Sequence, residues 1–327
     1  LEFRRVLFRS AGFDRDSLLA SRGVLMIATA DQEPRFRQFL AEARALGATD
    51  AALREVSAAE ALRLIPMLEP NYVCHACHEP GAMDIDVHAL HQGFLRGLRA
   101  RGGRLLLQAP VERLDRTGAA WRITTRAGQL TASVVVNAAG AWADEIAALA
   151  GVRPLGLVPK RRTALTFDAP PGTDARTWPM TCCIAETFYF KPDAGRILAS
   201  PADETPSPPC DAQPEEIDVA HAIDRVERAT ALRVRRVARK WAGLRSFVSD
   251  KAPVAGRDDQ APDFFWLAGQ GGYGIKTSPA LARVIATQVR GESAPDDLMR
   301  AGVSFRDLSV ERLRRPGNLT PHVTNVT

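Results

Sequence analysis

Two arginines and a tyrosine, far apart in the chain, could together bind an anion. Arg162 begins an extended stretch, Tyr189 lies between two phenylalanines, and Arg245 follows an apolar run. A guanidinium group in apolar surroundings is costly to bury without a partner, so Arg245 should face a carboxylate. That carboxylate could belong to a ligand or to an Asp or Glu of the protein. Spacing alone favours the second alternative, a structural ion pair.

A glycine-rich turn is a second candidate site. Residues 269–274, Gly-Gln-Gly-Gly-Tyr-Gly, have G-x-G-x-x-G spacing between an expected strand and an expected helix, a setting in which backbone N–H groups bind anions. A dinucleotide fingerprint also needs an acidic residue about 20 positions later, at the end of a second strand, and only the polar segment 291–297 follows. We therefore expect the turn to face a partly anionic ring, such as the edge of a reduced flavin. A purely structural turn is the alternative.

The cysteines offer two further interpretations. Residues 74–78 have the C-x-x-C-H spacing that attaches a c-type haem, so a haem electron carrier is one candidate function. However, haem attachment requires export and no secretory signal is visible, and a zinc site would need a second pair that Cys182, Cys183 and Cys210 do not supply. We expect chance spacing on a strand, and no metal site. The adjacent Cys182 and Cys183 cannot form an ordinary disulfide and need no redox role.

Helices and strands alternate in the first half of the chain, which is typical of an α/β layer. The predicted helices are 35–46, 57–65, 86–101 and 142–150. The predicted strands are 105–107, 121–125 and 130–137. The helix over 86–101 should bury one apolar face, formed by Val87, Leu90, Phe94 and Leu98.

The second half begins with a different pattern. Proline-rich residues 154–240 contain short strand-like pieces and one amphipathic helix over 215–232, which suggests an inserted α+β domain. The expected strands there are 164–167, 188–191 and 196–199. The α/β pattern returns with a strand over 264–268 and a helix over 277–290, so the first domain is discontinuous.

Composition excludes several classes of protein. The 327 residues are 46% hydrophobic and 25% charged, enough for about two folded domains. The net charge of +5 comes mostly from arginine, and the short basic runs are not interleaved with aromatic residues, so nucleic-acid binding is not expected. No apolar stretch reaches the roughly 18 residues of a membrane helix. Five cysteines, an odd number, suggest a reducing compartment and a cytoplasmic location.

The first ten residues look foreign to the protein. Residues 1–10 carry no periodicity that continues into the following chain, and they include no initiator methionine. They resemble the translation of a sequencing adapter. If so, the natural protein extends further upstream.

Six stretches together resemble the FAD-dependent D-amino-acid oxidase/dehydrogenase family, in the same order and over residues 11–312. They are Asp84–Arg96, Val136–Trp142, Pro159–Arg162, Phe188–Gly195, Trp241–Phe247 and Gly271–Ile275. Within the family, the likeness is greatest to the D-arginine dehydrogenases. The resemblance implies that FAD is the cofactor and an amino acid the substrate.

The resemblance also implies the architecture, a two-domain flavoprotein of class α/β plus α+β. An antiparallel-sheet substrate domain, residues 11–80 and 156–240, would cover a Rossmann-like FAD-binding domain, residues 81–155 and 241–295. Residues 296–327 would form a tail. The first βαβ unit of the family's FAD domain, about 30 residues or more, has no counterpart in this chain.

The family's substrate contacts transfer to specific positions. Arg162, Tyr189 and Arg245 would clamp the substrate carboxylate, a role that suits bidentate arginine and replaces the structural ion pair. The backbone carbonyl of Gly272 would accept a hydrogen bond from the substrate amine. The wall of the side-chain pocket would include Met180 and Cys182.

The family's cofactor contacts transfer in the same way. The adenosine and pyrophosphate of FAD would contact Val111, Ala139, Gly140 and Trp142. The turn beneath the flavin would consist of Gly271, Gly272, Tyr273, Gly274, Ile275 and Lys276.

The implied reaction transfers hydride from the substrate Cα to flavin N5, and the imino acid then hydrolyses to a 2-oxo acid and ammonia. The electron acceptor, oxygen or a quinone, stays open. The acid that meets guanidinium in arginine-specific members aligns with the apolar Leu25, so we expect apolar or neutral D-amino acids. The alternatives are a secondary-amine oxidase of the sarcosine or glycine type, the haem carrier, and an inactive FAD-free fragment.

Overall fold

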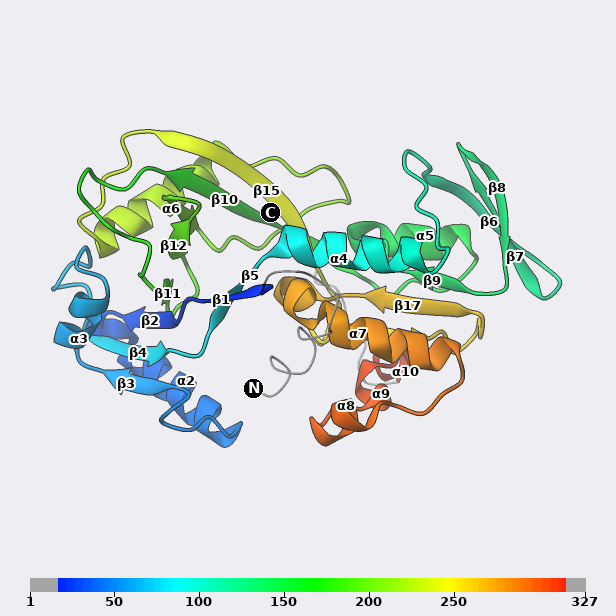
Figure 1. Ribbon diagram of the computed structural model, residues 1–327, viewed down its shortest axis with the longest axis horizontal. Helices are drawn as coiled ribbons and strands as arrows, with labels where there is room; N and C mark the ends of the chain where they lie inside the picture. The colour runs from blue at the N-terminus through cyan, green and yellow to red at the C-terminus, as the bar shows by residue number, and fades with distance from the viewer. Residues whose placement is uncertain (1–16, 316–327) are drawn as a thin grey trace.

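The computed structural model describes residues 17–315, so the predicted adapter sequence at 1–10 lies outside the described residues. These residues form two regions (Figure 1). One is built on a nine-stranded sheet, and the other on two three-stranded sheets with helices beside them. Within residues 17–315, no helix is both long and apolar enough to cross a membrane.

The nine-stranded sheet is antiparallel except where β11 pairs with β2, which confirms the predicted antiparallel-sheet region. The path runs β14-β10-β13-β12-β11-β2-β4-β3, and β15 pairs with β10. Its strands are β2 (Val24–Ala28), β3 (Arg54–Val56), β4 (His75–Glu79), β10 (Val158–Phe167), β11 (Met180–Cys183), β12 (Tyr189–Asp193), β13 (Arg196–Ser200), β14 (Thr205–Pro206) and β15 (Val237–Phe247).

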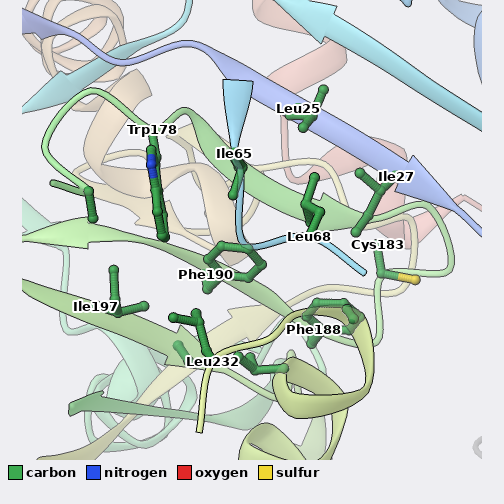
Figure 2. Close-up of a cluster of buried hydrophobic side chains, with 14 of the residues drawn as sticks. Leu25, Ile27, Ile65, Leu68, Trp178, Cys183, Phe188, Phe190, Ile197 and Leu232 are labelled. Carbon is green, nitrogen blue, oxygen red and sulfur yellow. The ribbon is translucent and has the colours of Figure 1, made fainter. Parts of the chain in front are cut away.

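Alternation along these strands separates two faces of the sheet. One face carries the largest core of the molecule, shown in Figure 2, in which Leu25, Phe190 and Ile197 are fully buried. Helices α3 (Ala58–Leu64) and α6 (Glu216–Ala229) contribute to that core. The opposite face is covered at one end by α2 (Glu33–Ala45), which follows the short helix η1 (Ala30–Gln32) and packs through Phe36 and Leu40.

The second region contains a small sheet in which β17 lies between β16 and β9, antiparallel to β16 and parallel to β9. Helix α7 packs against this sheet through Ala280 and Val284. A separate antiparallel sheet is formed by β6, β7 and β8, and β1 pairs with β5. The bounds are β1 (Leu19–Ser21), β5 (Met83–Ile85), α4 (Val87–Ala100), β6 (Val111–Thr117), β7 (Ala120–Thr125), β8 (Gly128–Ala132), β9 (Val135–Asn137), η2 (Gly140–Trp142), α5 (Ala143–Leu149), β16 (Val254–Arg257), β17 (Phe264–Ala268), η3 (Gly271–Tyr273) and α7 (Gly274–Val289).

Local signals locate most helices correctly. Ser57 caps α3, because its side chain accepts a hydrogen bond from the backbone N–H of Glu60. The strand predicted over 264–268 coincides with β17. The helices predicted over 35–46, 142–150 and 277–290 are also present, with ends that differ by one to three residues.

Three predictions about the second region are wrong. The strand expected over 130–137 is divided between β8 and β9, which belong to different sheets. Residues 105–107 form no strand, and their leucines are exposed. Helix α4 buries Leu90 but leaves Val87, Phe94 and Leu98 exposed. Periodicity identifies an apolar face, but it does not tell whether another element covers that face.

Two predicted boundaries also change. Strand β15 runs across residue 240 and pairs with β10 from Val237 to Phe247, so the nine-stranded sheet extends past the boundary placed there. The predicted tail forms three short helices up to residue 315, and the buried Val310 and Leu313 hold it against the core. These helices are α8 (Asp296–Arg300), α9 (Phe305–Leu308) and α10 (Glu311–Arg314). The remainder of that prediction, residues 316–327, lies outside the described residues.

Candidate active site

Strands β10 and β15 bring three cationic side chains to one face of the large sheet. Lys160 and Arg245 are direct cross-strand partners, and Arg162 lies opposite Gly243. Residues two apart in a strand, such as Lys160 and Arg162, project to the same face. The intervening Arg161 projects to the face covered by α6, where it binds Asp218. We call the Lys160 side of the sheet the site face.

Tyr189, Met180 and Cys182 lie on the same site face. Cys182 pairs with Tyr189 across β11 and β12, while their neighbours Cys183 and Phe190 are buried in the core on the other face. All three are half-buried. Burial, followed by the neighbouring Cys183 and Glu186, raises the pKa of Cys182 to about 12, so this side chain is an uncharged wall residue.

The guanidinium group of Arg245 lies where the carboxylate clamp requires it. Tyr189 is near enough to influence its pKa, and a Cβ built on Gly272 would lie 3.1 Å from its Nη1. Within residues 17–315 it forms no ion pair, and Glu204 acts on it only at longer range. Burial lowers the pKa of Arg245, and the charge of Arg162 lowers it further. The structural ion pair that spacing favours is therefore wrong for Arg245.

Arg162, by contrast, has partners within the protein. Its Nε donates to the backbone carbonyl of Asp203 at 2.8 Å, and its Nη2 lies 3.2 Å from Oε1 of Glu204. Nζ of Lys160 lies 3.0 Å from Oε2 of the same carboxylate. Burial would raise the pKa of Glu204, but the hydrogen bond and charge of Lys160, with the charge of Arg162, outweigh it, and the pKa is lowered.

Sequence reasoning misses both Lys160 and Glu204 as site residues. Lys160 carries a usable signal, because it lies two positions before Arg162 in an extended stretch. Glu204 comes from the connection between β13 and β14, and no local pattern predicts where that connection runs.

The glycine turn after β17 packs directly on β15. Gly271 has φ +52°, and a Cβ built on it would lie 2.5 Å from Cε1 of Phe247. Only glycine permits this approach. Lys160 Nζ lies 5.1 Å from the centroid of the Phe247 ring, so the turn lies beside the cationic cluster. Helix α7 starts at Gly274 and presents the positive end of its dipole at this turn.

Most of the residues predicted to contact FAD follow β9 and β17 at one edge of the small sheet, whereas Val111 comes from β6 and residues 274–276 from α7. Because β9 and β17 are parallel, their carboxyl ends lie together, and residues 138–142 and 269–273 leave the sheet side by side. Val111 and Ala139 line one cavity of about 490 Å³, whose other walls include Leu106, Ile123 and Val136. Gly140 has φ +59°, and Trp142 is partly exposed beside it.

These features fit the cofactor that the sequence predicts. The cavity lined by Val111 and Ala139 suits a flat, mostly apolar group, and the turn at Gly271 suits a ring with a partly anionic edge. The remaining predicted contacts continue into α7, where the Lys276 Nζ lies 4.6 Å from the centroid of the Tyr273 ring. Gly274 and Ile275 form the first turn of that helix.

Leu25 does not belong to the site. It is fully buried in the core of Figure 2, together with Ile27, on the face opposite the cationic cluster. Its neighbours Val24 and Met26 are the residues of β2 on the site face, where they pair with Met180 and Cys182. A shift of one residue along a strand exchanges its two faces, so the predicted alignment fails here.

The C-x-x-C-H spacing lies at the start of β4, as predicted, on a strand in the interior of the large sheet. Cys74 is exposed, whereas Cys77 is buried, and burial raises the pKa of Cys77 to about 12. Within the described part of the chain, no group of three histidines, cysteines or acids is placed to hold a metal ion.

Comparisons with known proteins identify the family. A model of the DAO family, described as FAD dependent oxidoreductase, matches residues 1–288. The uncharacterized oxidoreductase YurR of Bacillus subtilis is 25% identical over 255 residues, which are 75% of this chain and 65% of YurR. The mitochondrial dimethylglycine dehydrogenase of Mus musculus is 24% identical over 257 residues, which are 72% of this chain and 29% of that enzyme.

The fold has solved relatives as well. The crystal structure of glycine oxidase from Geobacillus kaustophilus matches with a TM-score of 0.74 and 21% identity, over 90% of this chain and 75% of that one. The chain spans less than two thirds of the length of either sequence relative named above, 65% of YurR and 29% of the mouse enzyme.

Proposed function

The chain belongs to the DAO family of FAD-dependent oxidoreductases, with FAD as cofactor, and on this premise we propose that it oxidises an α-amino acid at the carbon that bears the nitrogen. The product is an imine, which water hydrolyses to a 2-oxo acid and ammonia. The electrons pass finally to oxygen or a quinone. The family supports an oxidoreductase of amino-type substrates, and the choice of amino acid is our inference.

One observation carries the proposal: Arg245 is a half-buried cation without an ion pair among residues 17–315. A buried charge without a partner is costly, and a ligand carboxylate removes that cost. Tyr189 and Gly272 lie beside the guanidinium, so the group is held in place before a ligand arrives. A carboxylate-bearing substrate is the simplest occupant.

The chain's own residues bind and orient this substrate. Arg245 and Tyr189 hold the carboxylate, and Arg162 adds positive charge from the adjacent strand. The carbonyl of Gly272 accepts a hydrogen bond from the amine, which fixes the second end of the substrate. FAD, when bound beside the turn at Gly271, supplies the two-electron oxidation. No side-chain base is required if the amine binds uncharged, so the contribution of the protein is orientation.

The wall of the site predicts the side chain of the substrate. Met180 and Cys182 share the site face with Val24 and Met26, and all four are uncharged. A cationic side chain would find no partner on this wall. We therefore infer a substrate with an apolar or neutral side chain, with Val24 and Met26 in the role that sequence alignment gives to Leu25. The D configuration is inferred from the family resemblance alone.

A second candidate, oxidation of a secondary or tertiary amine, is favoured by the similarity to dimethylglycine dehydrogenase. N-methylated glycines carry the same carboxylate, so the Arg245 clamp would hold them equally well. The two candidates differ in what projects from the α carbon and from the nitrogen.

Steady-state kinetics of the FAD-loaded protein separate these candidates. We expect the highest kcat/KM with a neutral D-amino acid such as D-methionine, and at least about tenfold less with D-arginine or L-methionine. A higher kcat/KM with N-methylglycine or N,N-dimethylglycine would establish the second candidate. Absence of flavin reduction by every α-amino carboxylate would refute the proposed function.

A further inference from the structure

The site face has more positive charge than one substrate carboxylate needs. Lys160, Arg162 and Arg245 lie on two adjacent strands, with Lys160 directly opposite Arg245. The charge of Lys251 also acts on this cluster through Glu204. The carboxylate of Asp203 is turned away, because it accepts hydrogen bonds from the backbone N–H and hydroxyl of Thr163 at 2.7 and 3.1 Å.

Glu204 therefore supplies the carboxylate for this cluster. It bridges Lys160 at 3.0 Å and Arg162 at 3.2 Å, and within residues 17–315 it forms ion pairs with these two cations only. Its side chain is 42% exposed and belongs to a connection between strands.

The Glu204 carboxylate, between Lys160 and Arg162, occupies a second position where an anion could bind, beside the one at Arg245. Directly opposed residues of paired strands have Cβ atoms about 5 Å apart, so an anion on Lys160 lies close to one on Arg245. A substrate with two carboxylates could place one on Arg245 and the other on Lys160 and Arg162. With Glu204 present, the second substrate carboxylate would meet a like charge instead.

We propose that Glu204 is a specificity-determining residue that occupies a second carboxylate subsite, formed by Lys160 and Arg162, and so restricts the enzyme to monocarboxylates. The inference rests on the proposed function in that the first carboxylate binds Arg245. It identifies the removal of one side chain as the step that would admit acidic amino acids.

Substrate pairs of equal size test the subsite. D-Glutamate and D-glutamine differ mainly in charge, so the ratio of their kcat/KM values reports the second carboxylate alone. Glu204→Gln removes the charge and keeps the volume, whereas Glu204→Ala removes both. We expect the glutamate-to-glutamine ratio to rise at least about tenfold in Glu204→Ala and by a smaller factor in Glu204→Gln. A purely structural role would lower both substrates equally and leave the ratio unchanged, which would overturn the proposal.

Glu292→Gln is the matched control, because Glu292 pairs with Arg290 in an exposed position after α7. This variant should keep the wild-type ratio. Binding gives a second measurement that does not depend on turnover: glutarate should raise the Tm of FAD-loaded Glu204→Ala more than butyrate does, and the two should have similar effects on wild type. If no amino acid is oxidised but glutarate still raises the Tm of Glu204→Ala more than butyrate does, the subsite is supported and the proposed reaction is refuted. Equal stabilisation of Glu204→Ala by both acids would refute the subsite.

Discussion

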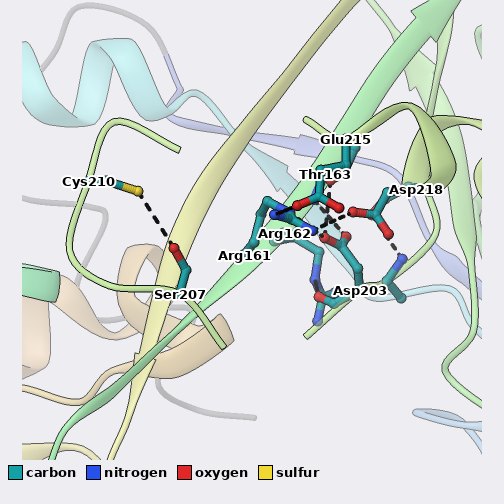
Figure 3. A network of polar contacts seen from close by, with 10 residues as sticks. Arg161, Arg162, Thr163, Asp203, Ser207, Cys210, Glu215 and Asp218 are labelled. Atoms are coloured by element: carbon teal, nitrogen blue, oxygen red, sulfur yellow. Dashed lines mark hydrogen bonds and ion pairs between the residues drawn. The ribbon is translucent and has the colours of Figure 1, made fainter. Parts of the chain in front are cut away.

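Two consecutive arginines on β10 have different surroundings on the two faces of the large sheet. Figure 3 shows Arg161 and Arg162 with their neighbours. Arg161 faces α6, where it pairs with Glu215 and lies 2.9 Å from Asp218, and its side chain is 12% exposed. Asp203 lies 3.9 Å from its Nε. Three carboxylates thus surround one cation.

On the site face the proportion is reversed. Within the described residues, Lys160 and Arg162 pair with the single carboxylate of Glu204, and Arg245 forms no ion pair. Positive charge that is not fully neutralised lowers the stability of the folded protein. The same uncompensated charge allows the site to bind an anion. Charge pairing, and not residue type, distinguishes the structural Arg161 from Arg245, the arginine that we assign to substrate binding.

The largest expected effect comes from Arg245→Ala. Removal of a charged hydrogen-bonding partner from the substrate carboxylate costs about 2–4 kcal/mol, so kcat/KM should fall by about 30-fold to 900-fold, through a higher KM and a lower kcat. The Tm should stay unchanged or rise, because the variant loses a cation without an ion pair. Kinetics and thermal unfolding of the FAD-loaded variant measure both quantities. Wild-type KM and kcat in Arg245→Ala would contradict the clamp.

Arg161→Met should show the opposite pattern. It leaves the largely buried carboxylate of Asp218 without its cation, which should lower the free energy of unfolding by roughly 2 kcal/mol. The substrate KM should change less than about twofold, because Arg161 does not reach the site face. Denaturant unfolding and steady-state kinetics on one preparation test both statements. A large increase in KM without loss of stability would show that the two faces are not independent.

Local patterns predict those parts of the fold that depend on local interactions. The cap at Ser57 and the strand over 264–268 follow from neighbouring residues, and the structure confirms both. The exposure of Phe94 and the missing strand at 105–107 depend on which elements pack nearby, and periodicity carries no such information.

The site residues likewise fall into those that the sequence predicts and those that depend on distant parts of the chain. Family likeness predicts that Arg162, Tyr189 and Arg245 act together on one carboxylate, and strand pairing puts them on one face of the sheet. It assigns Leu25 wrongly, because a one-residue error in register exchanges core and site. The partner of Arg162, Glu204, lies 42 positions away in the chain, so pairing on the site face could not be predicted from spacing.

Gly272→Ala tests how closely the turn controls Arg245. The added Cβ would lie 3.1 Å from Nη1 of Arg245, a contact that the flexible guanidinium can relieve only by moving away. We expect kcat/KM to fall about fivefold to tenfold, mainly through KM. The control is Gly81→Ala, because a Cβ on Gly81 meets nothing within 4 Å. Equal kinetics for the two variants would argue against a close fit between turn and clamp.

Tyr189→Phe should have the smallest effect. It removes one hydroxyl near Arg245 and keeps the ring, and a single hydrogen bond contributes about 0.5–1.5 kcal/mol, so KM should rise about twofold to tenfold while kcat changes less. The charge balance on the site face stays the same, because a neutral phenol is replaced by a neutral ring. If charge is what distinguishes the two faces, Tyr189→Phe must therefore weaken substrate binding far less than Arg245→Ala does, with no change in Tm beyond that of a surface variant. Equal losses from the two substitutions, measured as KM for the same substrate, would mean that hydrogen-bond geometry and not unpaired charge controls the binding of the carboxylate.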